Sequence, residues 1–141
     1  MEALTMAVRV AGMILILLAG LHVPIGRRLA WREESRRLSP ANEAIFHAHA
    51  FFICFVLVMM GLPCLLEPAI LLEGSRAGAW LAWSFSAFWT TRLVVQCFVF
   101  PARLWRGKPM ETLAHICFSI LWLAMSVLFT ICGAWQAGWI P

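Results

Sequence analysis

The sequence predicts an all-α membrane protein with four transmembrane helices in an up-and-down bundle. Of its 141 residues, 62% are hydrophobic and 13% are charged, which is about half the charged share of a typical soluble domain. Four continuous apolar segments each reach the roughly 20 residues that cross a bilayer as a helix. Because the segments do not alternate polar and apolar residues, helices are favoured over barrel strands. We therefore expect one integral-membrane domain, residues 1–141, with helices at approximately 4–25, 42–66, 77–101 and 109–135.

The first apolar segment, residues 4–25, predicts a helix that is retained rather than a cleaved signal peptide. A secretory signal has a basic start, a shorter apolar region and a cleavage site after small residues. Here Glu2 and Arg9 are the only charged residues near the amino end, and Arg27 and Arg28 follow the segment. The segment therefore counts as the first crossing.

Basic residues gather in two of the expected loops, residues 26–41 and 102–108. Eight of the eleven basic residues lie there: Arg27, Arg28, Arg32, Arg36, Arg37, Arg103, Arg106 and Lys108. Short basic loops stay on the cytoplasmic side of a membrane, so we predict an inner (plasma) membrane protein with both termini outside the cytoplasm. The arginines are expected to attract anionic lipids, and the chain has no soluble region large enough to bind nucleic acid.

The second and fourth segments begin with the same arrangement of residues. In each, a proline in the first turn precedes a glutamate, and a histidine follows four residues later, giving the pairs Glu43…His47 and Glu111…His115. Proline is tolerated in a first helical turn, and glutamate is favoured beside the positive end of the helix dipole. The pattern predicts either a duplicated helical hairpin or independent use of the same helix-start residues.

The polar residues inside or beside the apolar segments lie toward the cytoplasmic ends of the predicted helices. Ionisable groups are costly in hydrocarbon, so a cluster on one side of the bundle predicts a functional site. The residues of this cluster are His22, His47, His49, Arg92, Gln96, Glu111 and His115. His22, His47, His49, Glu111 and His115 are candidate metal ligands, although not all together.

His47 and His115 are the strongest cofactor candidates, because their helices run in the same direction and place them at similar depth. His49 lies two residues after His47 and must face another side of the helix. The sequence does not decide which of the two faces the bundle interior.

Arg92 is the most costly residue, since a charged side chain within the membrane costs about 2.5–3.5 kcal/mol or more. Gln96, one turn further on, would relieve part of that cost. A carboxylate of Glu43 or Glu111 would relieve more, because arginine pairs bidentately with carboxylates. The alternative is a functional contact with an anion, a haem propionate or a quinone head group.

Three classes of function are compatible with these residues. The favoured hypothesis is a small redox or membrane-anchor subunit that binds haem b or a transition metal, with His47, His115 and Arg92 at the cofactor. The alternatives are a small transporter or proton-coupled channel, and a non-catalytic membrane subunit or assembly factor. A homo-oligomer or a partner subunit is expected under each class, and the sequence does not decide whether the protein is an enzyme.

Overall fold

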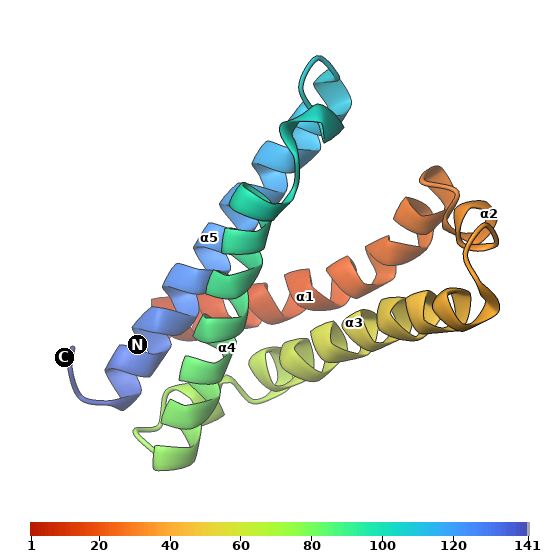
Figure 1. The fold of residues 1–141 in the computed structure, drawn as a ribbon. Coiled ribbons are helices and arrows are strands. Elements are labelled where there is room, and N and C mark those ends of the chain that lie inside the picture. The colour runs from red at the N-terminus through yellow and green to blue at the C-terminus, as the bar shows by residue number, and fades with distance from the viewer. Residues whose placement is uncertain (141) are drawn as a thin grey trace. The chain divides into compact units, whose positions relative to one another are not determined.

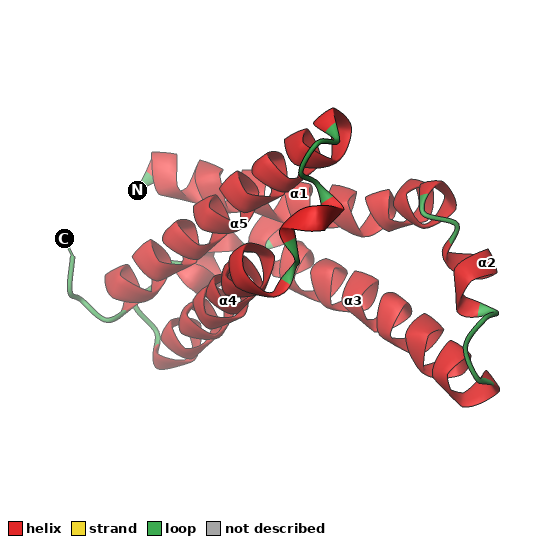
Figure 2. Ribbon diagram, turned by 45° about the horizontal axis from the view of Figure 1, so that its top comes forward, coloured by secondary structure: helices red, strands yellow, loops and turns green. Residues whose placement is uncertain are grey.

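The computed structural model describes residues 1–140, which are helical and contain no β-strand (Figures 1 and 2). The all-helical class predicted from the sequence is therefore confirmed. The α-helices are α1 (Glu2–Arg28), α2 (Trp31–Ser35), α3 (Pro40–Leu66), α4 (Arg76–Val94) and α5 (Pro109–Gln136). Three short turns of other helix types complete the order: η1 (Pro68–Leu71), the π-helical η2 (Val95–Val99) and η3 (Ala102–Leu104).

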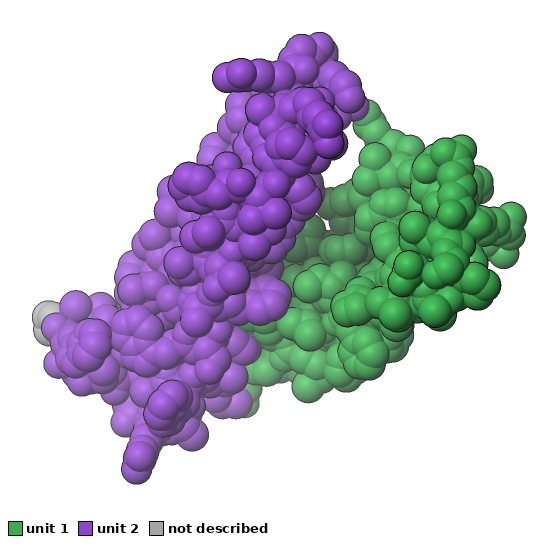
Figure 3. Space-filling model, in the orientation of Figure 1, with its two compact units in different colours: residues 1–68 green, residues 69–141 purple. Residues whose placement is uncertain are grey.

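The chain divides into two compact units, Met1–Pro68 and Ala69–Pro141 (Figure 3). Each unit is an antiparallel helical hairpin (Figure 1). In the first unit α1 packs against α3, and in the second α4 packs against α5. We call these units hairpin 1 and hairpin 2. The prediction of a single four-helix domain concerns how the two hairpins combine, and it stays a prediction.

Three helices, α1, α3 and α5, are long and apolar enough to cross a membrane, so their composition suggests a membrane protein. The prediction of four such helices is wrong by one. The predicted third segment, residues 77–101, owes much of its apolar character to Val94–Phe100, but the α-helix ends at Val94. The helical part that remains carries Arg92 together with tryptophan, serine and threonine residues, which lower its hydropathy.

Hairpin 1 is closed by a seam of small residues. Gly12 of α1 faces Gly61 of α3, and both are buried. A Cβ atom added to Gly12 would lie 2.6 Å from the backbone nitrogen of Leu65 and 2.7 Å from the carbonyl oxygen of Gly61. The two backbones therefore touch, which is the close approach that small residues allow between membrane helices.

Hairpin 2 is closed by aromatic side chains instead. Trp89 of α4 stacks on Trp122 of α5 with ring centroids 5.0 Å apart. Phe85 meets Phe129 edge to face at 5.1 Å. Both are arrangements that aromatic rings favour. Large interlocking rings thus hold α4 and α5 together, where glycines hold α1 and α3.

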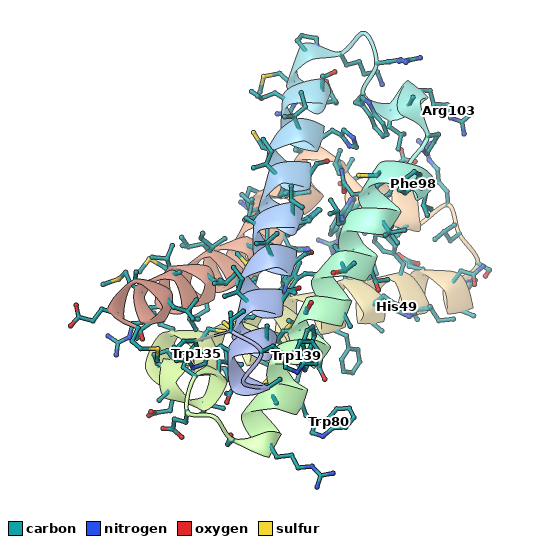
Figure 4. The ribbon with its side chains drawn as sticks, turned by 90° about the vertical axis from the view of Figure 1, so that its left-hand side faces the viewer. His49, Trp80, Phe98, Arg103, Trp135 and Trp139 are labelled. Atoms are coloured by element: carbon teal, nitrogen blue, oxygen red, sulfur yellow. The ribbon has the colours of Figure 1, made fainter. Side chains whose placement is uncertain are left out.

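The end of hairpin 2 opposite the α4–α5 loop is fixed by two side-chain to backbone hydrogen bonds. The indole Nε1 of Trp135 donates to the carbonyl of Leu72 at 3.0 Å, and Nε2 of Gln136 donates to the carbonyl of Ile70 at 2.9 Å. Figure 4 labels Trp135 and Trp139 near this end, and Arg103 at the loop end. The carboxyl end of α5 is therefore tied to the segment that leads into α4.

Candidate functional site

The structure places the predicted site residues in two clusters, each near the loop end of one hairpin. Arg92, Gln96 and His115 come together in hairpin 2. Glu43 and His47 come together in hairpin 1. The pairing of His47 with His115 around a haem concerns both hairpins, and it stays a prediction.

The π-helical turn at the end of α4 presents Gln96 to the interior of hairpin 2. Pro101 has no backbone N–H and does not continue a helix, and the last helical turn before it, Val95–Val99, is π-helical. Gln96 is only 6% exposed there, whereas Phe98 in the same turn is exposed (Figure 4). Single π-turns within helices occur frequently at functional sites.

A chain of hydrogen bonds runs from α4 through this turn to α5. Arg92 Nη1 donates to Oε1 of Gln96 at 3.0 Å. The amide nitrogen of the same side chain, Nε2, lies 2.8 Å from Nδ1 of His115. Gln96 therefore connects the arginine of one helix to the histidine of the other.

Arg92 determines the direction of these hydrogen bonds. A guanidinium carries only donors, so it requires the carbonyl oxygen of Gln96 as its acceptor. The amide nitrogen, also a donor, then faces His115, and Nδ1 of the neutral imidazole must accept. The proton of a neutral imidazole with an accepting Nδ1 lies on Nε2. Nε2 of His115 is therefore an N–H donor.

The loop of hairpin 2 holds the His115 ring in place. Trp105 stacks on the imidazole with centroids 3.8 Å apart and planes within 7°. The hydroxyl of Thr112 donates to the carbonyl of Trp105 at 2.7 Å, which ties the loop to the first turn of α5. One face of the imidazole is covered and its orientation is fixed from two sides.

Arg92 contacts two aromatic rings and the side-chain amide of Gln96. Its Cζ lies 5.1 Å from the centroid of Trp122 and 5.6 Å from that of Phe100. Gln96, one turn further along the chain on the same helix face, supplies the acceptor that was expected to relieve part of the cost of Arg92. The ion pair of Arg92 with Glu43 or Glu111 stays a prediction.

Hydrogen-bond donors outnumber acceptors around this cluster. The indole Nε1 atoms of Trp89 and Trp122 are buried and have no hydrogen-bond partner within residues 1–140. Arg92 lies over the Trp122 ring, and Nε2–H of His115 adds a further donor. Buried polar groups without a partner are uncommon in folded proteins and call for a physical explanation. A region of this composition favours a ligand that supplies accepting oxygen atoms.

The cluster in hairpin 1 contains serine, histidine and glutamate but lacks the geometry of a catalytic triad. Oγ of Ser35 lies 3.1 Å from Nε2 of His47 and 3.5 Å from Oε1 of Glu43. The glutamate oxygen is 4.0 Å from that same Nε2. In a triad, the nucleophile and the carboxylate contact opposite nitrogens of the histidine. Here both contact one nitrogen, and the serine is 3% exposed, so the arrangement fixes the loop.

The other two histidines bond to their own helices. Nδ1 of His22 donates to the carbonyl of Leu18, and Nδ1 of His49 donates to that of Ile45, both at 2.8 Å. His49 is exposed on α3 (Figure 4), and it does not take part in the Ser35 cluster that His47 joins. Each leaves Nε2 with a lone pair that suits a metal.

A metal site requires several ligands in one place, however. The described part of the chain has no group of three or more His, Cys, Asp or Glu side chains that could hold a metal ion. The predicted ligands His22, His49, His47 and His115 instead make the separate contacts described above, and Glu111 lies in the first turn of α5.

Three residues that shape these clusters were not expected from the sequence: Trp31, Ser35 and Trp105. All lie in the segments between the long helices. The available signal was a tryptophan in each basic loop, Trp31 in residues 26–41 and Trp105 in residues 102–108.

Comparison with protein-family models, with curated proteins and with solved structures finds no match for this chain.

Proposed function

We propose that the chain is a multi-pass membrane protein whose hairpin 2 binds the oxygen-bearing head group of a membrane-soluble molecule, with a quinone as the best-fitting class. The observation that carries this proposal is the Arg92–Gln96–His115 chain, which turns His115 into a donor. The role is that of a small redox or membrane-anchor subunit.

A quinone head group matches the donors of this cluster. Its carbonyl oxygens accept hydrogen bonds, and its ring stacks on aromatic side chains. The N–H of His115 would contact one carbonyl oxygen, and the positive charge of Arg92 would stabilise negative charge that develops on reduction. Fixed donors of this kind favour the reduced, anionic form over the neutral one.

The same geometry argues against haem or metal ligation through His115. A ligating histidine offers one nitrogen to the metal and donates the other N–H to an acceptor. In hairpin 2, Gln96 occupies Nδ1 as a donor, so Nε2 carries the proton. Ligation through Nε2 would require the side-chain amide of Gln96 to flip by 180°. Its nitrogen would then face Arg92, so that two donors would meet.

The cluster also lies in a suitable place for a membrane-soluble ligand. His115 is in the second turn of α5, and α5 is apolar enough to cross a membrane. The head group of a quinone would meet it where the apolar stretch begins. We further propose that the basic loop 102–108 lies on the cytoplasmic side of the inner membrane, and that both termini lie on the other side.

Binding of a short-chain quinone to the purified, detergent-solubilised protein tests this function. Quenching of tryptophan fluorescence reports binding, because Trp105 and Trp122 adjoin the cluster. We expect saturable quenching whose dissociation constant rises about tenfold or more in Arg92→Gln, since a charged hydrogen bond contributes about 1.5–3 kcal/mol. His115→Phe, which keeps a ring against Trp105, should raise it by about 2- to 12-fold.

His49→Phe is the matched control, because His49 is an exposed histidine of hairpin 1. It should bind the quinone as the wild type does. Unsaturable quenching in the wild type, or equal binding in all three variants, would contradict the proposal. A haem spectrum that disappears in His115→Phe would restore the haem hypothesis in its place.

A further inference from the structure

Hairpin 1 carries an open groove beside the short helix α2, with a volume of about 650 Å³. The end of α1, the first three residues of α2, Arg36 and the start of α3 supply its walls. Three arginines line it, Arg27 from α1 and Arg32 and Arg36 from the loop segment. The quinone proposal concerns hairpin 2 and does not use this groove.

The loop of hairpin 1 is built to hold α2 in one position. Ala30 has φ 50° and takes the left-handed conformation just before α2 begins. Trp31 then packs against Gly26, where an added Cβ would lie 3.0 Å from the indole ring. It also meets Phe46 of α3 edge to face at 5.7 Å. The amino end of α2 is thereby fixed to both long helices.

The carboxyl end of α2 is fixed by Ser35, which is buried and contacts His47 and Glu43. Arg32 and Arg36 are four residues apart, so they project from the same side of this segment. Because α2 is fixed at both ends, their side chains are directed into the groove with Arg27.

These three arginines form no ion pair among residues 1–140. The next arginine differs, since Arg37 pairs with Glu34 at 3.2 Å and does not line the groove. Two carboxylates, Glu33 and Glu43, also line the groove, and Glu43 contacts Ser35 and His47. The arginines therefore exceed the carboxylates, and their guanidinium groups remain available to an anion.

We infer that this groove binds the phosphate head group of an anionic phospholipid. Guanidinium groups match the geometry of phosphate oxygens, and Val23, Gly26 and Trp31 give the groove an apolar wall for the glycerol and upper acyl chain. The position supports a lipid as the source of the phosphate. Helix α1 is apolar enough to cross a membrane and ends at Arg28, so the groove lies where that apolar stretch gives way to head groups.

Native mass spectrometry of the full-length protein, released from micelles that contain phosphatidylglycerol or phosphatidylcholine, tests this inference. The wild type should retain phosphatidylglycerol in preference to phosphatidylcholine. A basic residue near a membrane surface contributes about 1 kcal/mol, which is about fivefold in affinity. Arg32→Gln combined with Arg36→Gln should therefore weaken retention of phosphatidylglycerol about 25-fold.

Arg37→Gln is the matched control, because it removes a neighbouring arginine that does not line the groove. It should retain phosphatidylglycerol as the wild type does. Arg27→Gln, an independent change on α1, should weaken retention about fivefold. Thermal unfolding in phosphatidylcholine micelles should be the same for all these variants, because the arginines are exposed.

Equal retention of the two lipids by the wild type would overturn the inference. Equal loss in Arg37→Gln and the double variant would overturn it as well, since it would reflect general charge attraction. A final measurement tests whether inorganic phosphate competes with phosphatidylglycerol for the groove. If phosphate alone displaces phosphatidylglycerol at equal concentration, the groove binds a free anion and the lipid assignment is wrong.

Discussion

Hairpin 1 and hairpin 2 have the same topology but are held together by different contacts. In hairpin 1 the backbones of α1 and α3 touch at Gly12 and Gly61. In hairpin 2 the rings of Trp89 and Trp122 stack between α4 and α5. Hairpin 1 is thus joined by backbone contact and hairpin 2 by side-chain contact. The Arg92–Gln96–His115 chain occurs in the hairpin that is joined by side chains.

The two hairpins also use the same glutamate–histidine spacing for different chemistry. His47 contacts Ser35 through Nε2, whereas His115 contacts Gln96 through Nδ1. The spacing places each histidine about one turn after its glutamate. The partner that reaches the ring then decides which nitrogen is left for a ligand.

The largest effect should come from the aromatic seam. Phe129 is fully buried and contacts Phe85, so Phe129→Ala should lower the free energy of unfolding by about 3–5 kcal/mol. Unfolding by a denaturing detergent in mixed micelles measures it. Ile120→Ala on the same helix, at a residue 63% exposed, should change it far less. Equal losses would show that the seam does not hold hairpin 2.

The glycine seam should show a smaller effect with a matched control on the same helix. An alanine at Gly12 would push against the α3 backbone, so Gly12→Ala should cost about 1–3 kcal/mol of unfolding free energy. Gly20 has open space around it, and Gly20→Ala should gain up to about 1 kcal/mol from helix propensity. The same detergent titration shows whether each variant lowers or raises the free energy of unfolding. If Gly12→Ala leaves that free energy unchanged, the helices are not in contact at Gly12.

Removing the link between Arg92 and His115 should cost about 1–3 kcal/mol, because Gln96→Leu leaves Arg92 without its acceptor and Nδ1 of His115 without its donor. Gln96→Glu keeps an acceptor for Arg92 and offers His115 an acceptor instead of a donor. It should therefore move the imidazole proton from Nε2 to Nδ1, which nitrogen NMR of labelled histidine detects. An unchanged proton position in Gln96→Glu would count against the role of Gln96.

The smallest effect is expected at the hydroxyl pair of hairpin 2. Oγ of Ser86 lies 2.7 Å from Oγ1 of Thr130, and hydrogen bonds between membrane helices average about 0.6 kcal/mol. Thr130→Val keeps the shape of the side chain and should lower the free energy of unfolding by about that amount. A loss as large as that of Gly12→Ala would place hydroxyl contacts, rather than rings, at the centre of hairpin 2.

Helix starts and the all-helical class followed from local signals in the sequence. Pro109 begins α5 as predicted, and α3 begins at Pro40, because proline suits the first turn of a helix. The end of α4 was harder to predict. Hydropathy extends through Phe100, whereas Pro101 ends the helix through a π-helical turn that apolar periodicity does not reveal.

The site was predictable in part. Arg92, Gln96 and His115 stood out as polar residues in apolar segments, and the structure brings them together. The carboxylate partner of Arg92 stays a prediction, because sequence spacing does not show which side chains meet across a hairpin or between hairpins. The contributions of Ser35 and Trp105 depend on the fold of short loops, for which the sequence offers no periodic pattern.

Nitrogen NMR of the four histidines in the detergent-solubilised wild type tests the central claim most directly. His115→Phe assigns the signal of His115 by its absence. The Arg92–Gln96–His115 chain predicts that neutral His115 carries its proton on Nε2, whereas His22 and His49, which donate through Nδ1, carry it on Nδ1. A proton on Nδ1 of His115 would contradict the account, because Nε2 would then carry a lone pair and accept rather than donate.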